Sequence, residues 1–330
     1  MSYNPKYKVA IISKNSIKYD VTGAVTDLVR QEPDGEIAQR ATFNLANVEV
    51  NGQLLSEIFD VMNRVFIYAN DGTEDEVFRG FIWDFNDEQD KDKNIPVVAY
   101  DNLIFFQESE DYHYFSAGYS TKSICATLCG NWGVKLKYNY AYITHPKLPL
   151  RGNLADIFLT DLLEEVRKKT GYKSVMRSIK DVVHIDGVGS NTTVYKILGG
   201  TDGNAVKTSA NKTMNGVVTK VVIIGKEDKN DRAQVEDVVS GNTSQYGTLQ
   251  KVVSVSSGTT LAEVKEEAKE TIKENGKPKK TYDVTSVDIP WIRKGDRVYV
   301  NAGCMNGYYI VKSITHNCSN KTMAMEAVDV

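Results

Sequence analysis

Apolar and polar residues alternate along much of the first hundred residues, as they do in strands that bury one face. Ala41, Phe43 and Leu45 alternate with polar residues, and a period of two places all three on the same side of a strand. Similar segments recur between turn-forming residues, so we expect further strands at 9–12, 25–29, 64–68, 77–85 and 95–100. The Glu-Pro-Asp-Gly sequence at 32–35 fits a type I turn and predicts a hairpin. Together these segments predict an N-terminal β-barrel or sandwich.

The apolar period changes after residue 120. Apolar residues recur there at intervals of three and four, which predicts amphipathic helices near 120–132 and 156–169. A glycine follows each helix, where it favours termination. Strand candidates come next at 172–176 and 182–185. This mixture predicts a small α+β domain in the middle of the chain.

Residues 199–212 are rich in Gly, Thr, Ser and Asn, which indicates a loop or linker. Beyond it, Thr260 and Glu263 form the capping-box pattern of a helix over 260–275, and Gly276 stands where a left-handed stop is favoured. Strands are expected before and after this helix, at 217–225, 250–254, 296–300, 308–315 and 321–328. The last part of the chain is therefore predicted to be mainly β, with an inserted helix.

These patterns predict three domains, because 330 residues exceed what one hydrophobic core usually serves. We expect an N-terminal β domain at 1–104, an α+β middle domain at 105–200 and a C-terminal β domain at 201–330. The apolar content of 41% and the charged content of 25% are close to those of soluble globular proteins, so disorder is not expected.

Charge and terminal sequence exclude several classes of function. The 40 basic and 43 acidic side chains give a net charge of −3, without the clustered basic surplus of proteins that bind nucleic acids tightly. The polar N-terminus lacks the pattern of a cleavable signal peptide, so we expect synthesis in the bacterial cytoplasm. The longest apolar run, at 217–225, is too short to span a bilayer, so no membrane segment is expected.

Histidines and cysteines do not have the spacing of a metal site. The histidines are scattered, at His113, His145, His184 and His316, so no strand or helix presents two imidazoles to one metal. Cys125 and Cys129 lie on the apolar face of the first helix, while Cys304 and Cys318 are far away in sequence. Reduced, buried thiols are expected for all four cysteines.

Other candidate motifs are incomplete. Gly187 and Gly189 lack the third glycine of a dinucleotide loop, and no Gly-Lys-Ser/Thr sequence follows the glycine-rich segment 199–203. Carboxylates cluster at 84–92, 108–111 and 227–237, and most of these segments indicate solvated turns. A pair of carboxylates in a cleft, as in a glycoside hydrolase, stays open. We therefore expect no catalytic, cofactor-binding or metal-binding residues.

The chain has 18 tyrosines, and six of them cluster at Tyr112, Tyr114, Tyr119, Tyr138, Tyr140 and Tyr142. Tyrosine provides a large contact area and is common at protein interfaces and sugar-binding surfaces. Ordinary packing at strand edges is the alternative interpretation. The cluster is therefore a candidate contact surface.

Several segments, taken in order, resemble the baseplate hub proteins of contractile tails in PBSX-like prophages, myophages and R-type bacteriocins. They are Val-Phe-Arg-Gly-Phe-Ile at 77–82, Val-Ala-Tyr-Asp-Asn-Leu-Ile-Phe-Phe at 98–106, the helix at 121–132, Tyr-Gly-Thr-Leu-Gln at 246–250, Lys-Gly-Asp-Arg-Val-Tyr-Val at 294–300 and Gly-Tyr-Tyr-Ile-Val at 307–311. Their order and spacing extend over nearly the whole chain. The resemblance implies two tube-like β-barrel domains that flank the α+β domain, the second barrel carrying the inserted helix.

The resemblance also implies a function without an active site. It implies a homotrimer whose two barrels per chain form a pseudo-sixfold ring between the hexameric tail tube and the trimeric spike. Tube, spike, other baseplate and LysM-type tail proteins would be its partners in a phage tail, a bacteriocin or another contractile injection system.

Three alternatives remain. A cell-wall hydrolase would use a carboxylate such as Glu108, Glu110 or Asp111 near the tyrosines, and a carbohydrate-binding module would use the tyrosines themselves. A type VI secretion spike is the third alternative, although the chain ends after the last expected strand, with no β-helical repeat.

Overall fold

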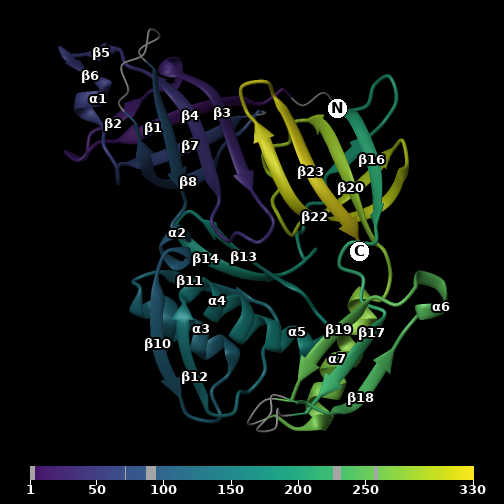
Figure 1. Ribbon diagram of the computed structural model, residues 1–330. Coiled ribbons are helices and arrows are strands. Elements are labelled where there is room, and N and C mark those ends of the chain that lie inside the picture. The colour runs from purple at the N-terminus through teal and green to yellow at the C-terminus, as the bar shows by residue number, and fades with distance from the viewer. Residues whose placement is uncertain (1–3, 71, 87–93, 226–231, 256–258) are drawn as a thin grey trace. The chain divides into compact units, whose positions relative to one another are not determined.

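The computed structural model of the chain describes residues 4–70, 72–86, 94–225, 232–255 and 259–330, and Figure 1 shows its helices and strands. The chain forms two compact units. Unit 1 consists of Met1–Ser209 and Tyr282–Val330, and unit 2 consists of Ala210–Thr281. The chain leaves unit 1 after Ser209 and returns to it at Tyr282, so unit 2 is an insertion in the sequence of unit 1.

The N-terminal part of unit 1 is built from antiparallel strands in which buried and more exposed side chains alternate. Its main strands are β1 (Lys6–Ile12), β3 (Val25–Glu32), β4 (Arg40–Ala46), β7 (Arg64–Asn70), β8 (Glu74–Phe85) and β9 (Asn94–Tyr100), with β2 (Lys18–Asp20) at the edge. Ala41, Phe43 and Leu45 of β4 are buried, as their period predicts. The predicted hairpin is confirmed, since Gly35, at φ +81°, lies in the turn between β3 and β4. Short elements occupy the connections: η1 (Thr22–Ala24), β5 (Glu49–Val50), β6 (Gln53–Leu54) and α1 (Leu55–Ile58).

Gly80 allows two neighbouring strands of this sheet to approach closely. It lies in β8, and a Cβ atom placed on it would come within 2.1 Å of the carbonyl oxygen of Tyr100 in β9. Any side chain at this position would have to displace the β9 backbone. The glycine of the 77–82 motif is therefore required by local packing.

The C-terminal strands of unit 1 continue the same sheet. They are β15 (Lys196–Leu198), β16 (Ala205–Thr213), β20 (Lys279–Val287), β21 (Arg297–Ala302), β22 (Met305–Asn317) and β23 (Thr322–Asp329). The last residues of β16 and the first residues of β20 fall within the bounds of unit 2. Strand β22 pairs with β23 and also with β3, so N-terminal and C-terminal strands form one sheet of 13 strands. Its order is β16-β20-β23-β22-β3-β4-β9-β8-β7-β1-β2, and β21 pairs with both β15 and β22.

The loop predicted at 199–212 is wrong in its second half, because β16 occupies Ala205–Thr213. None of the side chains of β16 is fully buried. A strand at the edge of a sheet is held through backbone hydrogen bonds to its neighbour, which is β20 here, and it can therefore be polar on both faces. Its composition resembles that of a loop for this reason.

The middle of unit 1 mixes helices with short strands around a core of its own. Its strands are β10 (Glu110–Phe115), β11 (Lys135–Asn139), β12 (Leu148–Asn153), β13 (Ser174–Ile179) and β14 (Val182–Gly187). Its helices are α2 (Ile104–Gln107), α3 (Thr121–Asn131), α4 (Leu154–Asp156), the π-helical segment η2 (Ile157–Leu163) and α5 (Glu164–Thr170). Phe106 stacks on Phe158 in this core, with ring centroids 5.4 Å apart. Both predicted helices are confirmed, and Gly171 ends α5 in the left-handed conformation.

Unit 2 consists of a three-stranded sheet and one long helix. Its elements are β17 (Lys220–Ile224), β18 (Val235–Ser240), α6 (Thr243–Tyr246), β19 (Gln250–Ser254) and α7 (Leu261–Asn275). Val264 and Ala268 of α7 pack against Val221 and Ile223 of the central strand β17. The capping box at Thr260 is confirmed. The left-handed stop predicted at Gly276 is wrong, because its φ is −78°. A Cβ atom there would lie 2.2 Å from the carbonyl oxygen of Ile272, so close packing requires this glycine.

The prediction of an α+β, mainly β chain with a helix inserted among the C-terminal strands is confirmed. The N-terminal strands, the middle part, the C-terminal strands and unit 2 each have a separate apolar cluster. The domain boundaries expected at residues 104 and 200 stay a prediction.

Candidate functional site

The candidate carboxylates near the tyrosines lie on and beside β10. Asp111 accepts hydrogen bonds from Trp132 Nε1 at 2.9 Å and from the Tyr112 backbone N–H at 2.8 Å, and His113 Nε2 lies 3.2 Å away. Burial alone would raise the pKa of Asp111, but these hydrogen bonds outweigh it and hold the pKa below its usual range. Glu108 and Glu110 are exposed. Asp111 is therefore an anionic structural acceptor, whereas an acid catalyst needs a raised pKa.

The tyrosine cluster divides into exposed and packed members. Tyr112 and Tyr114 alternate with inward residues of β10 and are 67% and 55% exposed. Tyr119 and Tyr142 are also exposed. In contrast, Tyr138 packs against the middle core and donates a hydrogen bond to the carbonyl of Ala141 at 2.7 Å, while Tyr140 packs against the same core and donates to Tyr172 O. Tyr112 and Tyr114 thus form an exposed aromatic face on the two-stranded sheet β10-β12.

The histidines lie in separate places with separate partners. His145 is 2.8 Å from Thr121 Oγ1, and His184 is 3.9 Å from Asp186. His316 is fully buried. Within the described ranges, no group of three or more His, Cys, Asp and Glu side chains could hold a metal ion.

The cysteines are free, and three of them are buried, at Cys125, Cys129 and Cys318. Burial raises the pKa of Cys129 to about 12, so this thiol stays neutral. The expectation that all four are buried is wrong for Cys304, which is exposed in the turn between β21 and β22.

The remaining candidates lie in turns or outside the described residues. Residues 87–92 of the first carboxylate cluster and residues 227–231 of the third lie outside them. In the glycine-rich segment, a Cβ atom on Gly203 would lie 2.2 Å from the carbonyl oxygen of Leu198, and Gly189 has a φ of +74°. Both glycines serve tight backbone turns.

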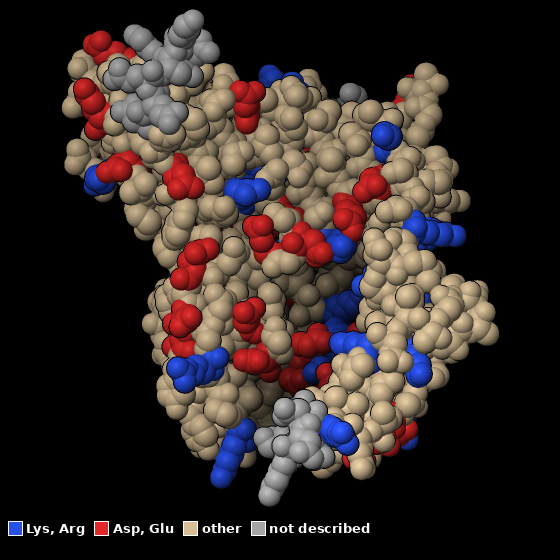
Figure 2. All heavy atoms as spheres, in the orientation of Figure 1, with Lys and Arg blue, Asp and Glu red and all other residues tan. Residues whose placement is uncertain are grey.

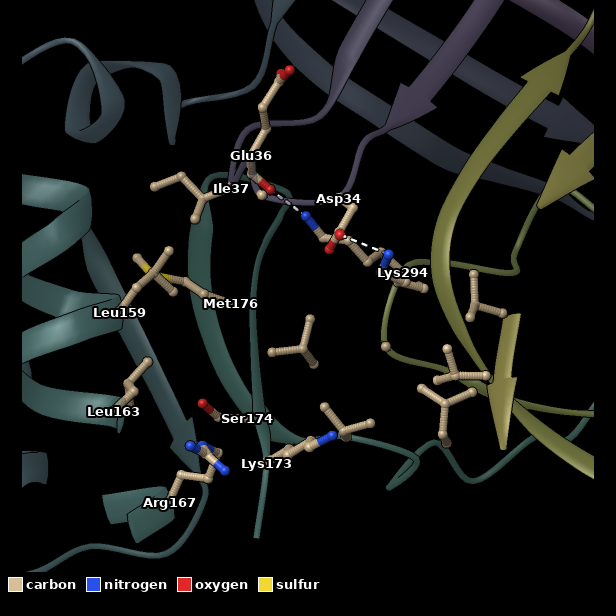
Figure 3. Close-up of a pocket in the computed structure, with 18 of the residues that line it drawn as sticks. Asp34, Glu36, Ile37, Leu159, Leu163, Arg167, Lys173, Ser174, Met176 and Lys294 are labelled. Carbon is tan, nitrogen blue, oxygen red and sulfur yellow. Dashed lines mark hydrogen bonds and ion pairs between the residues drawn. The ribbon is translucent and has the colours of Figure 1, made fainter. Parts of the chain in front are cut away.

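Unit 1 contains a cavity of about 490 Å³ where several of its parts meet. Its lining comes from the β3–β4 turn, η2, α5, β13, β22, β23 and the segment that precedes β21. Figure 3 shows Ile37, Leu159, Leu163 and Met176 on one side of it. Arg167, Lys173 and Ser174 lie together at one end, and Asp34, Glu36 and Lys294 lie at the other. The cavity therefore has an apolar wall between two polar ends.

Lys294 is a half-buried cation at the end of this cavity where Asp34 and Glu36 lie. Its ammonium group donates to the carbonyl of Pro33 at 2.9 Å and to that of Glu36. Burial lowers the pKa of Lys294, and attraction to Glu32 and Asp34 opposes this effect. The lysine thereby ties the β3–β4 turn to the segment that precedes β21.

The strands and the segment that line the cavity also carry a cluster of buried ion pairs. Arg177 of β13 lies 2.6 Å from Asp296 and 3.5 Å from Asp186 of β14. Arg293 forms a second pair with Glu32 of β3, with 2.5 Å between Nε and Oε1. Buried pairs cost desolvation energy, but the loss of one partner leaves a charge uncompensated. They therefore hold β3, β13 and the segment before β21 in one arrangement.

Asp101 adds an acid to the same region. It is 2% exposed and accepts hydrogen bonds from the backbone N–H groups of Gln39 at 3.1 Å and Leu103 at 3.0 Å. Burial raises the pKa of Asp101 to about 7, although Arg293 and the two hydrogen bonds lower it. This carboxyl group therefore titrates near neutral pH.

A second buried polar cluster joins the N-terminal strand β1 to the C-terminal strand β22. His316 Nδ1 lies 2.6 Å from Asp288 Oδ1, and the Tyr7 hydroxyl donates to the other oxygen of Asp288. The fully buried Arg30 donates to the carbonyls of Val77 at 2.9 Å and Pro290 at 2.8 Å. The cluster thus connects five segments of the chain, namely β1, β3, β8, residues 288–290 and β22.

Both clusters were missed by sequence reasoning. Their only signal is a charged residue at an inward position of a strand, such as Arg30 in β3 or Arg177 in β13. Such a residue indicates a buried partner, since charged side chains are rarely buried alone. The sequence does not reveal which residue provides that partner.

The surface and the helices add two findings. The face of the molecule in Figure 2 carries both acidic and basic side chains and shows no broad basic area, in agreement with the net charge of −3. Among the described residues, no helix is both long and apolar enough to cross a membrane.

Comparisons with known proteins extend over nearly the whole chain. A family model described as YQBQ-like matches residues 37–327, whereas no curated protein matches. The prophage MuSo2 43 kDa tail protein from Shewanella oneidensis is 12% identical, with a TM-score of 0.69 and 98% of both chains covered. The tail protein from Neisseria meningitidis MC58 is 11% identical, with a TM-score of 0.68 over 98% of this chain and 96% of that chain.

A third similar structure is E. coli c3393, described as a type VI secretion component with structural similarity to the T4 bacteriophage tail proteins gp27 and gp5. It is 8% identical, with a TM-score of 0.52 over 99% of this chain and 77% of that chain. At such identities the similarity concerns the fold. Together with the family match, it confirms the resemblance to tail proteins that the ordered motifs indicated.

Proposed function

Because the chain belongs to the YQBQ-like family and shares its fold with prophage tail proteins, we propose that it is a structural baseplate hub subunit of a phage-like contractile tail. In this role it joins the hexameric tail tube to the trimeric spike. The observation that carries the proposal is the fold similarity over 98% of this chain and 98% of the Shewanella tail protein. The similarity therefore includes nearly all elements of both chains and not one domain alone.

The internal organisation of unit 1 supports such a role. N-terminal and C-terminal strands belong to one sheet through the β3–β22 pairing. A trimer would present each group of strands three times, which gives six strand groups around an axis. The buried pairs Glu32–Arg293 and Arg177–Asp296 hold these parts together, as a subunit that transmits force between a tube and a spike requires. The three domains expected within 1–104, 105–200 and 201–330 are part of this proposal.

Surface complementarity, not catalysis, is the proposed mode of action. The exposed Tyr112 and Tyr114 provide a contact face for neighbouring subunits, since tyrosine is enriched at interfaces. Asp111, the acid next to them, has a lowered pKa, and its Oδ2 atom contacts Trp132 Nε1 and His113 Nε2. This arrangement disfavours the cell-wall hydrolase.

The test is the oligomeric state of the purified chain together with its presence in particles. Native mass spectrometry should show a trimer at micromolar concentration, and antibody labelling should place the chain at the baseplate end of tail particles. Stable association usually buries more than about 1,200 Å² in total. A chain that stays monomeric at high concentration and is missing from purified particles would exclude the proposal.

The similarity to E. coli c3393 favours a second candidate, a spike-like component of a type VI secretion system. The two candidates differ in the proteins that copurify with the chain. A hub should copurify with sheath, tube and separate spike proteins of a tail. The exposed tyrosines also leave peptidoglycan binding as an alternative, and retention of the chain on insoluble peptidoglycan, lost in Tyr112→Ser, would favour it.

A further inference from the structure

We propose that the cavity of unit 1 binds a short peptide segment of a neighbouring subunit, in which an aliphatic side chain precedes a carboxylate. The cavity, of about 490 Å³, falls within the range of ligand pockets. The inference rests on the proposed role of the chain in a particle with several subunits, and it names one surface through which a partner is held.

The walls of the cavity provide the apolar half of the recognition. Leu159, Val188, Ile310 and Val328 line the cavity and are only half-buried. They come from η2, the residue that follows β14, β22 and β23. When an apolar group covers half-exposed aliphatic side chains that line one cavity, the free energy falls because apolar surface leaves water. An aliphatic side chain of a partner would do so.

The charges around the cavity provide the polar half and select an anion. Asp34 pairs with Lys312 at 3.0 Å, and Glu164 pairs with Arg167 through Arg167 Nε at 2.7 Å. Among the described residues, the Lys173 ammonium group makes no hydrogen bond or ion pair, although it attracts the Glu164 carboxylate. Lys173 is thus the cation of the lining whose hydrogen-bonding capacity stays available.

At the opposite end, the charge of Lys294 is hydrogen-bonded to backbone carbonyls only, at Pro33 and Glu36. The carboxylates of Glu32 and Asp34 also attract Lys294, so the end of the cavity at Lys173 is the one that favours an added negative group. A peptide with a carboxylate next to an aliphatic side chain would pair with Lys173 and cover the apolar wall at the same time.

The cavity wall is formed before a ligand arrives. The Gly295 N–H donates to Val311 O at 2.8 Å, and the Gly189 N–H donates to Gly295 O at 2.8 Å. A Cβ atom on Gly295 would lie 2.8 Å from side-chain atoms of Val175, so the segment before β21 packs tightly against β13. A fixed wall reduces the ordering cost of binding.

The probe for this proposal is the peptide acetyl-Gly-Ser-Leu-Val-Asp-Gly-amide, whose aspartate is its only carboxylate. Binding to the purified full chain is measured by NMR titration, and we expect a Kd below about 1 mM. Two control peptides replace its aspartate by asparagine or its Leu-Val by Ser-Ser. Each control should bind at least tenfold more weakly, because one half of the recognition is removed.

Three variants locate the binding. Lys173→Glu reverses the available cation and should weaken binding at least tenfold, while Val188→Trp should fill the cavity and abolish binding. Lys122→Glu, an exposed lysine outside the lining, is the matched control and should change Kd less than twofold. Lys173 is exposed, so its variant should fold even if Val188→Trp does not, and tryptophan fluorescence checks both.

The outcomes separate this inference from the proposed function. Tight binding of the acidic peptide that Lys173→Glu removes supports the cavity as the site. Equal binding of the asparagine peptide, binding unchanged in Lys173→Glu, or no binding at millimolar peptide would overturn the inference. If the chain still forms trimers and enters particles in those cases, only the cavity proposal fails. Absence of the trimer and of particle incorporation would instead exclude the hub role.

Discussion

The buried ion pair between Arg177 and Asp296 is the interaction whose loss we expect to damage unit 1 most clearly. The two side chains are each 10% exposed and lie 2.6 Å apart. In Arg177→Met, the aliphatic part of the side chain is kept, but the carboxylates of Asp296 and Asp186 lose a cation. Removal of one partner of a buried pair costs about 3 to 5 kcal/mol. We expect a decrease of this size in the free energy of unfolding.

A second substitution measures the interaction energy between Arg177 and Asp296. Asp296→Asn removes the charge but keeps an acceptor for the Arg293 backbone N–H, which lies 2.9 Å from Oδ2. The double variant Arg177→Met with Asp296→Asn should be more stable than the sum of the single changes by about 1.5 to 3 kcal/mol. A coupling energy near zero would show that the two groups do not stabilise each other in the folded chain.

The assay is urea unfolding followed by tryptophan fluorescence. The three tryptophans are Trp83, Trp132 and Trp291, and all of them belong to unit 1, so the signal reports that unit alone. Lys168→Met is the control, since Lys168 and Glu165 are 48% and 40% exposed and exposed pairs contribute about 1 kcal/mol or less. The reasoning is refuted if Arg177→Met costs no more than this control.

The pH dependence of the same variant has a defined sign. Burial raises the pKa of Asp296 above that of an unfolded chain, and Arg177 opposes this rise. Without Arg177 the folded pKa rises further, so the folded chain takes up a proton as the pH falls. The destabilisation by Arg177→Met should therefore be largest above the folded pKa of Asp296 and should shrink toward low pH.

Three further results are expected. Asp101 has a folded pKa of about 7, against about 3.9 in unfolded chains. Because the folded chain binds this proton more tightly, the free energy of unfolding of the wild type should fall by up to about 4 kcal/mol as the pH rises from about 4 to about 7. Urea unfolding of Asp101→Asn at pH 5 and pH 8 should show a much smaller loss, and an equal loss would contradict the assignment. Gly80→Ala should lower the free energy of unfolding by more than about 2 kcal/mol through the contact with Tyr100 O, whereas Gly23→Ala, with open space around its Cβ position, should cost less than about 1 kcal/mol. Replacement of residues 214–278 by a short Gly-Ser linker should leave unit 1 folded, because β16 and β20 are neighbours in its sheet; loss of the tryptophan unfolding transition would contradict the division into two units.

The sequence was informative wherever burial follows a strict period. Strands such as β4 and helices such as α3 were predicted because one face of each is packed against a core. Strand β16 was missed because an edge strand with exposed side chains on both faces has the composition of a loop. The reason for Gly80 was also hidden, since it depends on the approach of β9 to β8.

The candidate site was less accessible to sequence reasoning than the fold. The buried ion pairs bring together three distant segments of the chain, which contain Glu32, Arg177 with Asp186, and Arg293. The spacing of residues along the chain does not predict which of them will pair. The cavity has the same origin, because its apolar residues belong to separate elements in which each fits an ordinary core pattern. Of the residues singled out beforehand, Tyr112 and Tyr114 lie on an exposed face, as a contact surface requires.

The most direct test of the central claim is cryo-electron microscopy of the tail particles that contain this chain. The proposed function predicts three copies in a ring at the baseplate end of the tube, with the N-terminal and C-terminal strands of unit 1 at six similar positions around the axis. A ring of six copies, a single copy, or density for the chain only outside the tube axis would contradict it.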